Sequence, residues 1–183
     1  MRLFVKTRES IGRRKVRKIL KTFARERYAH NFDTAGFIAV LFDAGIEDSF
    51  NEIKNFRKYL KDLNIKTEFI GYIDQDEVHP DMILLDKVKI ITRKDLDFFQ
   101  RPKDPDIVKF LEKEPDILID LCLHRYFPVD YILSLSKAHF KVGCYEENSK
   151  YDMMIHVEKD PKVAYLIEQV KNYVSIINSS KSK

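Results

Sequence analysis

Two stretches of this chain are almost continuously apolar, and they constrain its fold more than any other feature. Residues 37–43 read FIAVLFD and residues 116–121 read DILIDL, without a regular alternation of polar and apolar side chains. A strand with one solvent-facing side alternates, whereas a strand covered on both faces is apolar throughout. Both stretches are therefore predicted to be central strands of a mainly parallel sheet.

The rest of the chain alternates between short apolar segments and amphipathic ones. Further strands are expected at 66–73, 88–91, 140–143 and 151–157, and helices at 48–63, 93–99, 107–113, 129–137 and 160–177. This alternation is typical of an α/β fold built from right-handed β-α-β units. We expect a Rossmann-like three-layer sandwich, in which a single mainly parallel sheet has helices on both faces. Its core should contain Leu41, Ile117, Ile119 and Leu166.

A length of 183 residues suits one domain with a full core and an appendage. We divide the chain into a basic N-terminal helical arm (1–34), an α/β domain (35–178) and a polar tail (179–183). The start of the chain has no apolar h-region, and no apolar run approaches the length of a membrane span. Cys122 and Cys144 belong to no C-x-x-C motif and are expected to be reduced core thiols of a cytoplasmic protein.

The positive charge of the chain is concentrated at its beginning. Residues 1–30 hold eleven Lys and Arg against two acidic residues, a net charge of +9, whereas the other 153 residues carry 22 basic and 27 acidic ones, a net charge of −5. Residues 10–28 are predicted to form a basic amphipathic helix that Ser10 can cap. Its narrow apolar stripe consists of Val16, Ile19, Leu20 and Phe23.

A basic arm on a mildly acidic body favours a polyanionic partner. We expect the arm to dock on RNA or on a ribonucleoprotein such as the ribosome, through contacts to the phosphate backbone. The same helix could instead lie on an anionic membrane surface, although its apolar stripe is small and lacks Trp. A third interpretation is a solvated helix that only aids solubility. The candidate polyanion-binding residues are Arg13, Arg14, Arg17, Lys18, Lys21 and Arg25.

The carboxyl ends of the predicted central strands form a second candidate site. Ligands of open parallel sheets bind at this edge, and Asp43 and Asp120 would lie near each other there if their strands are neighbours. Two carboxylates and a His can carry out acid–base chemistry or hold a divalent cation. Capping helices and closing turns is the simpler interpretation. The possible ligand-edge residues are Asp43, Gly45, Asp120, His124 and Arg125.

No motif indicates a specific reaction, cofactor or metal. A phosphate cradle needs several glycines before a helix, whereas the segment DAGIEDS has one Gly and three acidic residues. The five His residues are scattered without an H-x-x-x-H pair, so we expect no metal site. We therefore favour a protein without catalysis of its own and without a cofactor, and keep a ligand-binding or enzymatic role at the strand edge as the alternative.

The segments 37–50 (FIAVLFDAGIEDSF), 93–102 (RKDLDFFQRP) and 116–143 (DILIDL…FPVDYILSLSKAHFKVG) resemble an uncharacterised single-domain family of Bacteroidetes proteins. The basic leader is also typical of that family. Because the family has no assigned function, the resemblance implies no functional residue.

DILIDL, the helix after it and LSKAHFKVG are similar to a strand–helix–strand in the N-terminal half of heptosyltransferase-like glycosyltransferases. Those enzymes bind a nucleotide sugar with a second Rossmann-like domain, for which this chain has no room. Their acidic base follows a Gly after the first strand, whereas here Ile46 follows Gly45. The similarity thus implies an inactive relative rather than an enzyme.

Overall fold

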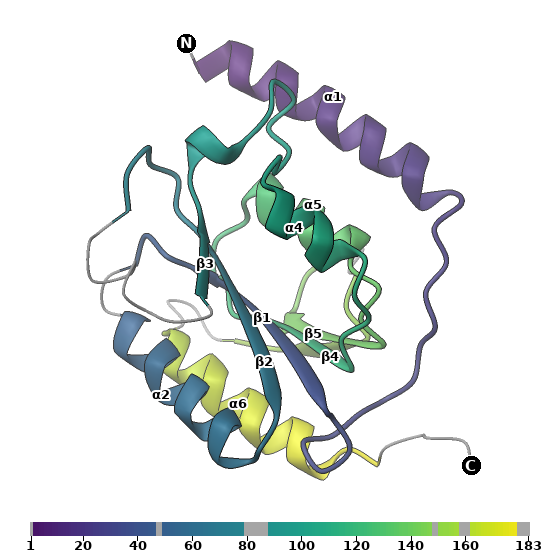
Figure 1. Ribbon diagram of the computed structural model, residues 1–183, viewed down its shortest axis with the longest axis vertical. Helices are drawn as coiled ribbons and strands as arrows, with labels where there is room; N and C mark the ends of the chain where they lie inside the picture. The colour runs from purple at the N-terminus through teal and green to yellow at the C-terminus, as the bar shows by residue number, and fades with distance from the viewer. Residues whose placement is uncertain (1, 47–48, 79–87, 148–149, 158–161, 179–183) are drawn as a thin grey trace.

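The computed structural model describes residues 2–46, 49–78, 88–147, 150–157 and 162–178 (Figure 1). The helices are α1 Arg2–Leu20, α2 Phe50–Asp62, α4 Pro105–Leu111, α5 Phe127–Leu135 and α6 Val163–Ile176. The strands are β1 Phe37–Asp43, β2 Lys66–Tyr72, β3 Val88–Ile91, β4 Ile117–Asp120, β5 Phe140–Cys144 and β6 Met153–Ile155. The helix predicted at 93–99 is wrong, because only Arg93–Asp95 forms a 3₁₀ turn, which a capping box between Thr92 and Asp95 closes.

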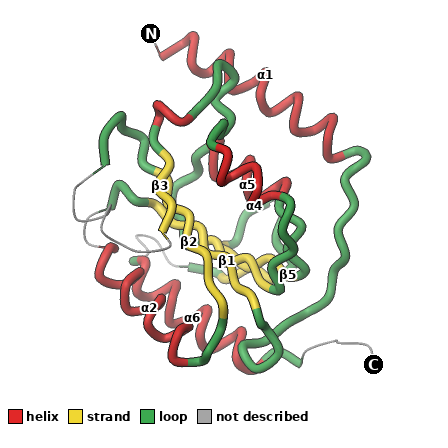
Figure 2. The backbone as a smooth tube through the Cα atoms, in the orientation of Figure 1, coloured by secondary structure: helices red, strands yellow, loops and turns green. Residues whose placement is uncertain are grey.

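The strands form a single sheet in the order β3-β2-β1-β4-β5-β6, and each neighbouring pair is parallel. From β1 the chain moves outward through β2 to β3, then crosses back to β4 and moves outward on the other side (Figure 2). β1 and β4 are therefore the central strands, as their apolar sequences predict. The expected single parallel sheet of an α/β fold is confirmed.

The two faces of the sheet bury two separate cores. In β1, Ile38, Val40 and Phe42 face the core shared with α2 and α6. Ala39 and Leu41 face the core shared with α4 and α5 on the opposite side. This two-sided burial explains why the strand has no polar alternation. Each of the four predicted core residues exposes at most 1% of its surface, which confirms the prediction: Leu41, Ile117, Ile119 and Leu166.

Helix α1 lies outside the sandwich and packs across α5 (Figure 1). The contact is close because Gly12 has no side chain: a Cβ atom there would come within 2.4 Å of the Phe99 carbonyl oxygen and 2.7 Å of the Phe127 ring. One turn further on, Val16 is buried against Phe127 and Leu135. Of the predicted apolar stripe, Val16 is buried as expected, whereas Ile19 is exposed.

The helix predicted over 10–28 has different ends in the structure. It begins at Arg2 and ends at Leu20, where the Thr22 hydroxyl and amide both donate to the Ile19 carbonyl oxygen. Residues 21–36, which we call the strap, then run down the side of the molecule to the start of β1 (Figure 1). The sequence has no helix stop here, and the strap is held instead by side-chain contacts to distant parts of the chain, such as that of Arg25 with Asp152.

Candidate functional site

The carboxyl edge of the sheet brings the predicted ligand-edge residues together. The chain reverses its direction of travel across the sheet between β1 and β4, and the crevice outside such a point is where open α/β sheets bind ligands. Asp43 ends β1 and Asp120 ends β4, and the register pairs Leu41 with Asp120. Both carboxylates therefore lie at this edge, on neighbouring strands, as predicted.

Asp120 is fully buried, and the protein itself satisfies both of its carboxylate oxygens. The Cys122 amide donates to Oδ1 at 2.9 Å. The Tyr151 hydroxyl and Arg125 Nη1 both reach Oδ2, at 2.5 Å and 3.0 Å. Burial, and then the negative charge of Asp120, raise the pKa of Tyr151 well above its usual range, so this phenol remains protonated. Asp120 thus closes a turn and anchors Tyr151.

Asp43 differs because one of its oxygens lacks a partner. The Gly45 amide donates to Oδ1 at 2.8 Å, which gives Gly45 its place in a tight turn. Oδ2 is buried and has no hydrogen-bond donor in good geometry within the described residues, although the Nδ1 atom of the exposed His124 lies 3.5 Å away and the Tyr126 hydroxyl interacts with this carboxylate. Burial, and next the charge of Asp43, raise the pKa of Tyr126 to about 12. A hydrogen-bond donor or a cation would find an unmet acceptor here.

The six candidate polyanion-binding residues divide into two groups. Arg13 is half-buried and contacts Asp130 at 2.8 Å and Glu9. Arg25 has only 5% of its side chain exposed and holds Asp152 with two hydrogen bonds, at 2.7 and 2.8 Å. These two guanidinium groups are bound to the body of the protein. The other four are exposed and have no acidic partner in the part of the chain that the structure describes: Arg14, Arg17, Lys18 and Lys21.

The four exposed cations form one stripe, which we call the outer face of α1: Arg14, Arg17 and Lys18 belong to the helix, and Lys21 is the first residue after it. Their spacing of i, i+3, i+4 and i+7 places them on one side of a helix, within about 10 Å along its axis. Two other basic residues of α1 lie over aromatic rings of the body: Lys15 Nζ is 3.5 Å from the centre of Phe99, and Arg8 is 4.1 Å from that of Phe98. These contacts, with the Gly12 packing, hold the outer face in a fixed orientation.

Sequence reasoning missed Tyr151, whose position under Arg125 depends on Gly143 of β5. A Cβ atom at Gly143 would come within 2.4 Å of the Tyr151 ring, so only glycine leaves room for the phenol. The sequence signal was a glycine inside a predicted strand, which often marks a close approach. It also missed Lys141, a buried lysine of the same strand whose Nζ donates to the Leu133 carbonyl oxygen at 2.6 Å.

Within the described residues, no helix has the length and apolar character that spanning a membrane requires. No curated protein matches the chain by sequence. A family model does match residues 8–177, a range that includes most of α1 and the whole strap. The helix, the strap and the parallel sheet are thus parts of one family architecture, and the chain belongs to the family of unknown function DUF6913.

Proposed function

We propose that the protein docks in the cytoplasm on RNA or on a ribonucleoprotein, of which the ribosome is one example, through the outer face of α1. The observation that carries this proposal is the set of exposed cations without acidic partners, Arg14, Arg17, Lys18 and Lys21. Such a stripe can neutralise several phosphates and release their counterions, which supplies affinity without sequence recognition.

The electrostatics of the rest of the chain support a contact through α1 alone. The 153 residues outside the first thirty carry a net charge of −5, so a polyanion is repelled by the body and attracted to the helix. Since α1 is fixed on α5 by Gly12 and Val16, the cations need little ordering on binding.

The test is co-sedimentation with ribosomes and with bulk RNA over a salt series. The variant replaces the four outer-face residues with Gln and leaves Arg13 and Arg25 in place, because those two hold the body together. We expect the parent to sediment with RNA and the variant to remain in the supernatant. The slope of log affinity against log salt should fall by roughly three, since each phosphate contact contributes about 0.7–0.9.

Helix α2 supplies a matched control. Lys54, Arg57, Lys58 and Lys61 repeat the i, i+3, i+4, i+7 spacing on the opposite side of the molecule. Their replacement with Gln removes the same charge and should leave sedimentation unchanged. Equal losses from both variants would mean that net charge alone determines binding, and the proposed face would be rejected.

Vesicles distinguish the membrane alternative. The parent should not float with vesicles of anionic lipid. Among the described side chains of α1 the exposed large apolar ones are Val5, Ile11 and Ile19, whereas a stable interfacial helix buries a broad apolar side. Flotation of the parent together with failure to sediment with RNA would replace the RNA proposal with a peripheral membrane one.

A second candidate function is binding of a small cationic ligand at the carboxyl edge. The specific observation is the buried Asp43 Oδ2, which has no hydrogen-bond donor in good geometry among the described residues. Titration with Mg²⁺, followed by the amide NMR signals of Ala44 and Gly45, tests it. Saturable shifts in the parent that disappear in Asp43→Asn support this function, and unchanged spectra in the parent reject a divalent cation as the ligand.

A further inference from the structure

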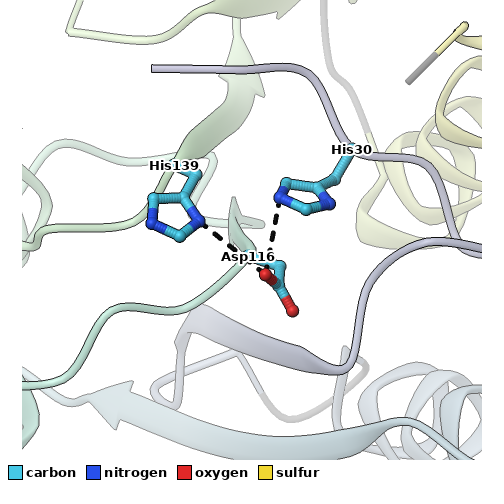
Figure 3. Close-up of side chains that lie close together, drawn as sticks. All are labelled: His30, Asp116 and His139. Atoms are coloured by element: carbon cyan, nitrogen blue, oxygen red, sulfur yellow. Dashed lines mark ion pairs between the residues drawn. The ribbon is translucent and has the colours of Figure 1, made fainter. Parts of the chain in front are cut away.

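Three potential metal ligands meet at the opposite, amino end of the sheet. His30 comes from the strap, Asp116 directly precedes β4, and His139 directly precedes β5 (Figure 3). The carboxylate oxygen Oδ1 of Asp116 lies 3.4 Å from His30 Nε2 and 3.7 Å from His139 Nδ1. The three ligand atoms all lie within 4.8 Å of one another.

The remaining polar atoms of these side chains are oriented by contacts of their own. The Tyr28 hydroxyl lies 3.0 Å from His139 Nε2, and the Thr34 hydroxyl lies 3.4 Å from His30 Nδ1. Asp116 Oδ2 accepts from the amides of Gly36 and Phe37, at 2.7 and 2.9 Å. Each group thus has one side fixed by an outer partner and its other side directed at the same point, which is the usual arrangement of metal-binding histidines and carboxylates.

The chemistry of the inner side requires a positive charge. A carboxylate oxygen and two imidazole nitrogens are all acceptors unless a nitrogen is protonated. His139 Nδ1 is buried and makes no hydrogen bond within the described part of the chain. Either protons on the imidazoles or a bound cation must therefore compensate the charge of Asp116.

The distances favour a cation. Bonds of about 2.0–2.1 Å in a tetrahedral zinc site place neighbouring ligand atoms about 3.3 Å apart. The two distances from Asp116 Oδ1, 3.4 and 3.7 Å, are near that value and too long for good hydrogen bonds to imidazole. Two imidazoles with one carboxylate are ligands that zinc and related divalent transition metals accept, with one position left for water.

We propose that His30 Nε2, Asp116 Oδ1 and His139 Nδ1 bind a zinc-type divalent transition-metal ion that fastens the strap to the starts of β4 and β5. The site is reachable from solvent, because Asp116 and His139 are partly exposed while His30 is buried. The ion supplies the positive charge between the three groups and joins segments that are far apart in the sequence.

The first measurement is metal binding by the full chain. The protein is stripped with a chelator, dialysed, and titrated with Zn²⁺ by calorimetry, and then with Co²⁺ by absorbance. We expect the protein to bind one equivalent of Zn²⁺ with a Kd in the micromolar range or tighter, and its Tm to rise by several degrees when Zn²⁺ is added. The Co²⁺ form should show an intense visible absorption band, which is typical of a Co²⁺ ion with a low coordination number.

Variants assign the ligands. His139→Gln and Asp116→Asn should each lower Zn²⁺ affinity at least tenfold and remove the Tm increase. His156→Gln is the matched control, since its side chain is exposed and lies outside the cluster, and it should bind as the parent does. His30→Gln serves as a further ligand variant if it folds.

Two outcomes overturn the proposal. In one, the stripped parent binds no Zn²⁺ and its Tm does not change when Zn²⁺ is added. Protons on the imidazoles, rather than a metal ion, would then compensate the negative charge of Asp116. In the other, His139→Gln and Asp116→Asn bind Zn²⁺ as tightly as the His156→Gln control. Should the ligand variants fail to fold, the NMR signals of the His30 and His139 rings in the parent decide, because only a bound ion shifts both at one equivalent of Zn²⁺.

Discussion

Helix α1 and the strap both carry basic residues, and the two segments use them in opposite ways. On α1 and at the residue directly after it, four cations face solvent without acidic partners in the described structure. In the strap, Arg25 is inserted into the body, where Asp152 and the carbonyl oxygens of Ala138 and His139 bind it. A net charge therefore does not say which basic residues are available to a partner. Acidic groups in later parts of the chain determine that.

The largest effect should follow removal of the inserted cation. Arg25→Met keeps the aliphatic stem but removes the guanidinium from Asp152 Oδ1 and from two carbonyl oxygens, while Asp152 Oδ2 keeps the Lys141 amide. Breaking a buried ion pair by removing one partner costs about 3–5 kcal/mol, and we expect a loss of this size in urea unfolding. Arg17→Met on α1 is the control and should change stability by about 0.5 kcal/mol or less. Equal losses of stability in the two variants would contradict the distinction between a structural cation in the strap and a solvent-facing cation on α1.

The second prediction concerns Lys141, which lies beneath the strap near Arg25 and Asp152. Burial, and secondly the charge of Arg25, lower its pKa to about 7. An unfolded lysine titrates near 10.4, so from pH 7 to pH 10 the unfolded chain binds a proton that the folded chain has lost, and stability rises with pH. Relative to Lys141→Met, the parent should gain roughly 3 kcal/mol over this range.

Urea unfolding of both proteins at several pH values measures this gain, and the difference between them cancels the titration of other groups. A constant difference from pH 7 to pH 10 would show that Lys141 titrates alike in the folded and unfolded states.

A smaller effect should come from separating α1 from α5. In Gly12→Val the new side chain overlaps the Phe99 carbonyl oxygen and the Phe127 ring. Overpacking of this kind costs about 1–3 kcal/mol. Amide exchange should become faster in α1, while the β1 and β4 amides keep their protection. Ser10→Val, at an exposed position of the same helix, is the control for helix propensity and should leave α1 protected.

The smallest change in stability belongs to the outer face itself. Replacing Arg14, Arg17, Lys18 and Lys21 singly with Gln should each alter the free energy of unfolding by about 0.5 kcal/mol or less. Thermal unfolding of each single variant measures this. A loss above 1 kcal/mol at any position would assign that residue a structural contact and remove it from the proposed docking face.

The sheet was predictable because its signal is local. β1 and β4 carry the evidence of two-sided burial in their own residues, and the meeting of Asp43 with Asp120 follows from the rule that parallel strands end at one edge. The end of α1 at Leu20 was not predictable. Residues 21–28 contain neither Pro nor Gly that would end a helix. The chain leaves the helix because Arg25 binds Asp152 and Tyr28 contacts His139, both far away in the sequence.

The His30, Asp116 and His139 cluster was likewise hidden. No short spacing connects these residues, and only the start positions of β4 and β5 bring two of them together. Their approach to His30 depends on the path of the strap, which has no regular secondary structure to reveal it. The five histidines form no closely spaced pair in the sequence, which is why the sequence alone predicts no metal site.

The distant contacts of the strap set the order in which the protein can fold. Arg25 bonds to Asp152, 127 residues later, and Asn31 Nδ2 donates to the Ile177 carbonyl oxygen, 146 residues later. During synthesis the strap leaves the ribosome well before its partners Asp152 and Ile177, so the β1-α2-β2 unit can pair while the strap is still undocked. Contacts that form after the transition state slow unfolding without speeding folding. We therefore expect the strap to dock late in folding and to contribute mainly to the lifetime of the native state.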